Sequence, residues 1–360
     1  MTSISDIART MRARMPWPVG RKVLVENDFP RGRGWEQTVT KLGSDQLKVT
    51  GNIEDLAAAL SEHILCGEKL SGFYNVDIEV LDRVRAKVLG MDVEETDFSR
   101  SYPAALTEDQ LADQHSGFVL TAVSRTEDGV AVVFSSVRVV TVREEIEPEE
   151  ISDELASLLE GYEEIVGLKT VRFQAFDVIW IPHNGSLIDV RVDYPAGTHQ
   201  DVAIAAHARI VDAFHTLVDE LLMAETVNLF PLIDRIYNDP SEGIVVELGF
   251  GTTTASLKNE KMRRKQLDLR EEQYHVGGKA ALTSPIEPFR LSVTWKRNVG
   301  GGRFSSPELS LNSNARAAGG IDPAIRNVVI RRCMGQADYE FVRSRIEHHL
   351  ATESSAEQKN

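Results

Sequence analysis

The strongest constraint on the fold is a regular alternation of apolar and charged residues near the middle of the chain. Apolar residues occupy the even positions from Ile188 to Tyr194, and the odd positions between them are Asp189, Arg191 and Asp193. Successive side chains of a strand point to opposite faces of its sheet. The pattern therefore predicts a strand with one buried face and one solvated face.

Two hairpins are expected around this strand. Residues 117–142 contain two apolar, β-branched runs joined by the turn TEDG, and residues 170–194 contain two more joined by the turn HNG. Strands joined by turns this short pair antiparallel. The sequence therefore predicts an antiparallel sheet, with further strands at 243–250 and 288–297.

Three segments have the apolar period of a helix. They span residues 52–67, 75–90 and 198–222. Asn52 is a favourable N-cap for the first, and Gly67 is expected to end it. The third is expected to pack on the sheet through its apolar stripe, and the residues that make this contact are Ile210, Phe214 and Leu217.

Two further segments have less regular patterns. The run RKVLVENDF (21–29) is predicted to be a strand. Residues 144–164 contain ten acidic and no basic residues, and their apolar positions follow a helical period. They are predicted to form a helix with an acidic outer face.

The order of these elements predicts an α+β fold, in which helices pack on one face of a mostly antiparallel sheet built from hairpins. We expect a small N-terminal mixed region at 1–110 and a central antiparallel domain at 115–300. A segment rich in Gly, Ser and Asn, residues 301–321, is predicted to be a linker. A C-terminal helical hairpin at 322–351 and a disordered tail at 352–360 should follow it.

The composition limits the class of protein. The chain has 360 residues, of which 42% are hydrophobic and 26% charged, as in globular proteins. It has no apolar run long enough for a transmembrane helix, and its N-terminus lacks the apolar stretch of a signal peptide. The two cysteines, Cys66 and Cys333, argue for a reducing compartment and against a disulfide scaffold or a structural zinc site. We therefore expect a soluble cytoplasmic protein with two buried thiols and no membrane contact.

The net charge of −15 is unevenly distributed along the chain. Residues 258–303, here called the basic segment, carry eleven basic and five acidic residues, whereas residues 1–257 carry 22 basic and 43 acidic. A basic segment in an acidic chain indicates a surface that meets a polyanion at short range. A solvated loop whose charges pair internally is the simpler alternative.

The candidate binding residues all belong to the basic segment. Lysine and arginine neutralise phosphates, and an aromatic side chain can stack on a base. We therefore predict a non-catalytic binding or regulatory protein that contacts nucleic acid, another polyanion or the acidic surface of a protein partner. The candidate residues are Lys258, Lys261, Arg263, Arg264, Lys265, Arg270, Tyr274, His275, Lys279 and Arg297.

Two other classes of function remain open. The sequence lacks the motifs of phosphate-binding loops, dinucleotide sites, serine hydrolases and zinc proteases, and no cofactor or metal is predicted. An enzyme with a dispersed active site near Tyr274, His275 and Lys279 is the first alternative. A protein–protein adaptor that docks through the acidic segment 144–164 is the second. The sequence leaves the oligomeric state unknown.

Overall fold

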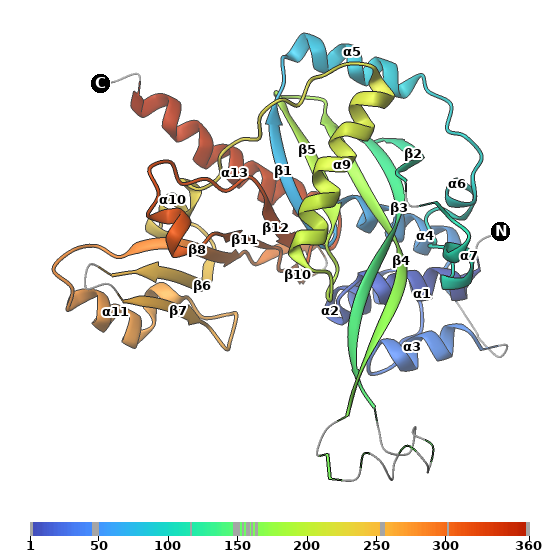
Figure 1. Ribbon diagram of the computed structural model, residues 1–360, viewed down its shortest axis with the longest axis horizontal. Helices are drawn as coiled ribbons and strands as arrows, with labels where there is room; N and C mark the ends of the chain where they lie inside the picture. The colour runs from blue at the N-terminus through green and yellow to red at the C-terminus, as the bar shows by residue number, and fades with distance from the viewer. Residues whose placement is uncertain are drawn as a thin grey trace.

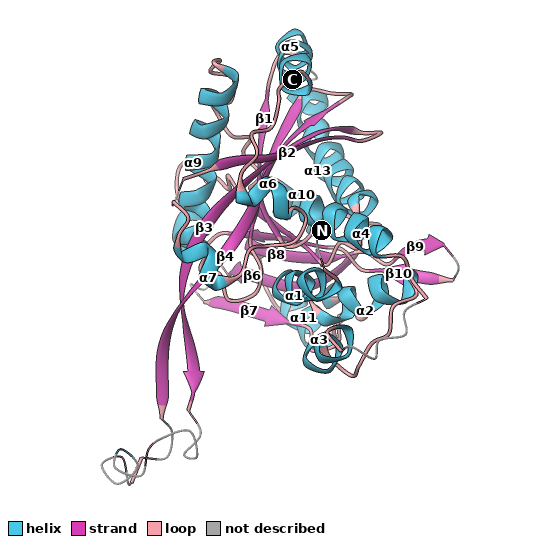
Figure 2. Ribbon diagram, turned by 90° about the vertical axis from the view of Figure 1, so that its right-hand side faces the viewer, coloured by secondary structure: helices cyan, strands magenta, loops and turns pink. Residues whose placement is uncertain are grey.

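The fold is organised by one large antiparallel sheet with helices on both sides (Figures 1 and 2). The computed structural model describes residues 3–44, 50–115, 117–146, 152, 155, 159, 161–162, 165–252, 256–300 and 302–357. Within them the sheet has ten strands in the order β2-β3-β4-β5-β1-β12-β11-β8-β6-β7. The predicted α+β class and antiparallel sheet are confirmed.

The strands of the large sheet come from most of the chain. They are β1 (Lys69–Asn75), β2 (Val119–Arg125), β3 (Gly129–Glu145), β4 (Val166–Pro182), β5 (Leu187–Asp193), β6 (Ile244–Gly251), β7 (Leu257–Lys261), β8 (Glu287–Thr294), β11 (Glu308–Asn312) and β12 (Val328–Arg331). A separate two-stranded sheet is formed by β9 (Arg297–Gly300) and β10 (Arg303–Ser305).

The helices precede, interrupt and follow these strands. In the described residues they are α1 (Ile4–Arg14), α2 (Trp17–Glu26), α3 (Trp35–Leu42), α4 (Ile53–Cys66), α5 (Ile78–Leu89), α6 (Asp97–Ser101), α7 (Glu108–Ala112), α9 (Gln200–Val218), α10 (Leu232–Asn238), α11 (Gln273–Ala280), α12 (Ala315–Ala318) and α13 (Gln336–Glu357). The helices predicted at 52–67, 75–90 and 198–222 correspond to α4, α5 and α9. The side chain of Asn52 caps α4 as expected, accepting a hydrogen bond from the Glu54 amide at 3.0 Å.

Helices cover both faces of the central strands, whereas the sequence predicted helices on one face. On the first face, α9 buries Ile210 and Phe214 in a cluster with Val190 of β5, and α5 joins the same cluster. On the second face, α1, α2 and α4 pack against β4 at Phe176 and Trp180. A third cluster holds α10 and α13 against β6, β8 and β11. The central strands are therefore buried on both sides.

The face of β5 that the sequence predicted to be solvated is buried. Asp189, Arg191 and Asp193 are each at most 1% exposed. Their charges are paired with one another or with residues of the covering helices. Arg343 of α13 lies 3.0 Å from Asp189, Arg191 lies 2.7 Å from Asp189, and Arg14 of α1 pairs with Asp193. The alternation of apolar and charged residues thus predicted the strand correctly. Its charged face can lie inside the protein because the charges form ion pairs there.

β3 and β4 extend beyond the sheet as a two-stranded arm (Figure 1). The pairing of β2 with β3 stops at Ser135, whereas β3 and β4 remain paired as far as Glu145 and Val166. The acidic helix predicted at 144–164 overlaps the last two residues of β3. Glu144 and Glu145 belong to β3, and most of the other residues of that segment lie outside the described part of the chain.

The strand predicted at 21–29 is wrong, because residues up to Glu26 form α2. A proline in the first turn favours the start of a helix there. Val19, Val23 and Leu24 are buried at helical spacing and pack in the cluster of α1 and α4. The apolar run was too short for its period to distinguish a strand from a helix.

The predicted C-terminal organisation also needs correction. The linker expected at 301–321 contains β11, which lies between β12 and β8 and buries Leu309 and Leu311. The first helix expected in the hairpin at 322–351 is replaced by strand β12. The second is α13, which continues to Glu357, so residues 352–357 of the expected tail are helical.

Two smaller expectations concern the cysteines and the membrane. Cys66 and Cys333 are both buried as free thiols, as predicted, and burial raises the pKa of each. Within the described residues, no helix combines the length and the apolar character needed to cross a membrane.

Candidate functional site

The ten candidate residues lie on β7, α11, β9 and the connection between β7 and α11. This connection contains a short 3-10 helix, Leu269–Glu271. Figure 1 shows β7 and α11 together at one end of the molecule, next to β6 and β8. Arg297 begins β9 and does not line the pocket described below.

Five of the eight lysines and arginines among the candidate residues are held by partners inside the protein. Lys261 pairs with Glu247 at 3.0 Å, and Lys265 pairs with Glu308. Arg270 donates hydrogen bonds to Asp268 and to three backbone carbonyls, those of Asp239, Glu242 and Gly243. Arg297 lies 2.5 Å from Asp338 of α13, and Lys279 donates to the Tyr237 hydroxyl at 2.7 Å. The positive charge of the basic segment is therefore largely compensated.

Three basic side chains remain without such a partner within the described residues. Lys258, Arg263 and Arg264 are exposed, and none of them makes a side-chain hydrogen bond or an ion pair there. Tyr274 is also exposed, at 73% of its surface, so its ring is accessible for stacking. These four candidate residues are exposed and unpaired within the described part of the chain.

A pocket of about 220 Å³ lies between the β6–β7 hairpin and α11. It contains two of the predicted basic residues, Lys258 and Lys279, together with Tyr274 and His275. The remaining lining residues are Phe250, Thr252, Ser256, Glu260, Gly278, Leu282 and Ile286. Ammonium groups, hydroxyls and apolar side chains thus surround one small volume.

Local structure explains how these side chains converge. Lys258 and Glu260 are two residues apart on β7, so both point to the same face of the hairpin. On the facing side, the carboxylate of Glu272 caps α11 by accepting a hydrogen bond of 2.8 Å from the backbone amide of His275. This cap fixes the first turn of α11 and places the imidazole against β7.

Four side chains form a continuous hydrogen-bond chain at this pocket. Glu260 Oε2 lies 2.6 Å from His275 Nδ1, and His275 Nε2 lies 2.7 Å from the Tyr237 hydroxyl. Lys279 Nζ lies 2.7 Å from the same hydroxyl. His275 and Tyr237 are buried, at 2% and 4% exposure. The two residues at the ends of the chain, Glu260 and Lys279, both line the pocket.

The chemistry of the four groups determines which of them donate and which accept the hydrogen bonds. An ionised carboxylate only accepts hydrogen bonds, so His275 Nδ1 carries a hydrogen, and in the neutral imidazole Nε2 is then an acceptor. The Tyr237 hydroxyl can then donate to Nε2 while its oxygen accepts from the Lys279 ammonium. Lys279 Nζ also lies 4.7 Å from the centre of the Tyr237 ring, a cation–π distance. The arrangement can pass a proton between a carboxylate and an ammonium at one pocket.

Two members of this chain were missed by the sequence analysis. Glu260 is one of the five acidic residues of the basic segment, and Tyr237 lies on α10, 38 residues before His275. Neither has a motif or a spacing that marks it. The β6–β7 pairing and the packing of α10 bring them to His275, and these are properties of the tertiary structure.

A second group of titratable residues is chemically unsuited to a metal ion. Ligand atoms of Asp239, Glu242 and His349 lie within 4.8 Å of one another. However, Glu242 already pairs with the Arg345 guanidinium and accepts a hydrogen bond from Trp295 Nε1 at 3.0 Å. A cation there would meet the positive charge of Arg345 at close range.

Comparisons with known proteins identify no relative of this chain. No protein-family model, no curated protein and no solved structure matches the chain.

Proposed function

We propose that the pocket between β7 and α11 binds a small ligand with an anionic group, for which phosphate is the best match, and exchanges a proton with it. The observation that carries this proposal is the chain Glu260–His275–Tyr237–Lys279, whose two ends both line the pocket. This proposed function is closer to the enzyme alternative than to an extended polyanion surface.

Electrostatics supports an anionic ligand. Lys258 and Lys279 contribute two positive charges to the pocket, and Glu260 contributes one negative charge. The hydroxyl of Ser256 adds a hydrogen-bond donor of the kind that phosphate oxygens accept. The exposed ring of Tyr274 offers a stacking surface for a base attached to that phosphate.

The chain also supports proton transfer. In the direction of these hydrogen bonds, protons move toward Glu260: Lys279 gives one to the Tyr237 hydroxyl, and Tyr237 gives its own to His275 Nε2. His275 then gives its Nδ1 proton to the Glu260 carboxylate. His275 and Tyr237, the two middle members of the hydrogen-bond chain, are buried, so water does not compete for their hydrogen bonds. A ligand could then gain a proton from Glu260 and lose one to Lys279, which restores both groups.

Calorimetric titration with adenosine monophosphate and inorganic phosphate at low salt tests the binding part. Lys279→Gln should weaken binding by about 10-fold to 150-fold, because a charge-assisted hydrogen bond contributes roughly 1.5 to 3 kcal/mol. Lys41→Gln is the matched control, since Lys41 is an exposed residue of α3, at the other side of the molecule in Figure 1. Equal affinities for the two variants, or no binding by the wild type, would contradict the proposal.

The tautomer of His275 tests the proton-transfer part. Long-range ¹H–¹⁵N spectra of the imidazoles should show a hydrogen on Nδ1 and a hydrogen-bonded, unprotonated Nε2 at neutral pH. Glu260→Gln should change this signature, because the amide can also donate to the ring. A hydrogen on Nε2 in the wild type would reverse the direction of the chain and contradict its proposed role.

Nucleic-acid binding is a second candidate, favoured by the three basic candidate residues that have no partner within the described residues. Arg263 and Arg264 are exposed next to β7, and Lys258 lies on it. Arg263→Ala with Arg264→Ala should leave the thermal midpoint almost unchanged, because exposed charges contribute little to folding. The double variant should bind a single-stranded oligonucleotide more weakly and with a flatter salt dependence. A wild type that binds no oligonucleotide at low salt would eliminate this candidate.

A further inference from the structure

A second cavity, of about 330 Å³, lies at the base of the β3–β4 arm. Its walls come from α1, α7 with the loop before it, β3, β4 and the loop between β5 and α9. Most of the lining is apolar, with Leu106, Leu111, Val140 and Phe173 among the contributing residues. A cavity of this volume is within the range that holds a small organic molecule.

Two walls of this cavity carry buried polar groups that have no hydrogen-bond partner within the described residues. Arg14 lines it and is 7% exposed, and its Nε has no hydrogen-bond partner within the described residues. The hydroxyl of Thr198, on another wall, is also buried and unpartnered there. Buried polar groups in proteins are nearly always hydrogen-bonded, so two unpartnered groups at one cavity indicate a ligand that accepts hydrogen bonds.

The buried charged groups around Arg14 favour a negatively charged ligand. Two cations, Arg14 and Lys69, share the single carboxylate of Asp193. The neighbouring Arg138 and Asp177 pair with each other at 2.5 Å and so add no net charge. The buried group therefore carries an excess of one positive charge, which is costly in an apolar interior unless an anion lies near it.

The pKa shifts of the buried groups are consistent with this excess of positive charge. Burial lowers the pKa of Lys69 to about 8, although Asp193 attracts its proton. Burial, with Arg14 and Lys69 nearby, also lowers the pKa of His63 to about 3, so that this ring adds no charge. Arg172 adds a further positive charge at the exposed side of the cavity and has no partner within the described residues.

We propose that this cavity binds an apolar small molecule with a single carboxylate group. The apolar part would lie against Leu111, Val140 and Phe173, and the carboxylate would accept hydrogen bonds from Arg14, Thr198 and Arg172. A carboxylate carries one negative charge, which matches the buried excess better than the nearly two charges of a phosphate monoester. This site is separate from the pocket at α11 and does not depend on the function proposed there.

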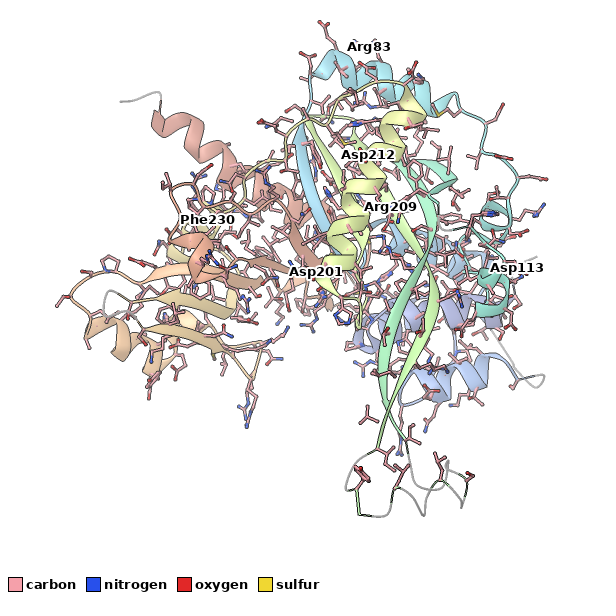
Figure 3. The ribbon with its side chains drawn as sticks, viewed as in Figure 1. Arg83, Asp113, Asp201, Arg209, Asp212 and Phe230 are labelled. Atoms are coloured by element: carbon pink, nitrogen blue, oxygen red, sulfur yellow. The ribbon has the colours of Figure 1, made fainter. Side chains whose placement is uncertain are left out.

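Paired probes test this assignment. Octanoate and phenylacetate are titrated into the full-length protein by calorimetry at pH 7, each beside its neutral alcohol, 1-octanol or 2-phenylethanol. At least one carboxylate should bind ten times more tightly than its alcohol. Thr198→Val and Arg172→Gln should each weaken carboxylate binding several-fold and leave alcohol binding within twofold. Arg83→Gln, at an exposed residue of α5 (Figure 3), is the charge-matched control.

Ala13→Trp tests the location of the site. Ala13 is an exposed residue of α1 that lines the cavity, so a tryptophan can fill the space with little change to the core. The variant should bind neither probe, whereas Ala58→Trp, at an exposed position of α4 outside the cavity lining, should bind as the wild type does. Circular dichroism and the thermal midpoint establish that both variants are folded. Equal binding of acid and alcohol, unchanged binding by folded Ala13→Trp, or no binding of either carboxylate at millimolar concentration would overturn the proposal.

Discussion

At the scale of single residues, His63 lies fully buried near the end of α4, beside Arg14 and Lys69. Neither of its ring nitrogens has a hydrogen-bond partner within the described residues. Burial and the two nearby cations lower its pKa to about 3, so the ring is neutral in the folded protein across the usual pH range. The unfolded chain binds a proton near pH 6.5 that the folded protein does not bind.

This difference predicts a loss of stability in acid. The folded pKa is the lower one, so the free energy of unfolding should decrease as the pH falls from about 6.5 to about 3. The complete shift corresponds to roughly 5 kcal/mol. Urea titrations at several pH values should show this slope, and His63→Phe should flatten it. The slope should not vanish, because burial also lowers the pKa of His207 to about 4. His199→Phe, at an exposed position, should keep the wild-type slope.

At the scale of secondary-structure elements, the sequence predicted the parts that carry their own local signal. Helix α4 has a capping asparagine and acidic residues in its first turn. The hairpins β2–β3 and β4–β5 have short turns between β-branched runs. Strands β11 and β12 have five and four residues, in segments rich in Gly, Ser and Asn or close to a proline. Their identity as strands depends on neighbours that are distant in sequence, which no local pattern contains.

The candidate site divides in the same way. The basic residues and His275 could be found from the sequence, because composition and residue type mark them. Their pairing could not be found, since Glu247 and Glu308 reach Lys261 and Lys265 through the sheet. The role of Tyr237 depends on how α10 packs beside α11, and this too is absent from any local pattern.

Helix α9 allows a direct test of its packing on the sheet. Phe214 is fully buried against the sheet, whereas Ile204 on the same helix is 42% exposed. The outer face of α9 also carries Asp201, Arg209 and Asp212 (Figure 3). Phe214→Ala should lower the free energy of unfolding by about 3 to 5 kcal/mol, because it removes apolar contacts and leaves a cavity. Ile204→Ala should change it by less than about 1 kcal/mol in the same urea titrations. Similar losses for both variants would mean that α9 is not packed as described.

At the scale of the whole molecule, the two cavities lie in different parts of one continuous sheet. The pocket at α11 is next to β6 and β7, at one edge of the sheet, and the cavity at the arm is next to β3 and β4, near the other edge. The strands between these edges are β5, β1, β12, β11 and β8. Both cavities therefore depend on the same set of central strands for their positions.

This strand order bears on the predicted central domain at 115–300. That segment contains β2 to β5 and β6 to β8, but β5 and β8 are separated in the sheet by β1, β12 and β11, which lie outside it. The two halves of an isolated 115–300 fragment would have no strands to join them, and each half would leave a buried edge unpaired. Such edges carry hydrogen-bonding groups that require a partner, and they promote aggregation. We therefore expect the fragment to fail to fold as a unit, giving a poorly dispersed ¹H–¹⁵N spectrum and no cooperative urea transition. The full chain should show both dispersion and a cooperative transition under the same conditions. A fragment that unfolds cooperatively would instead establish 115–300 as an independent domain.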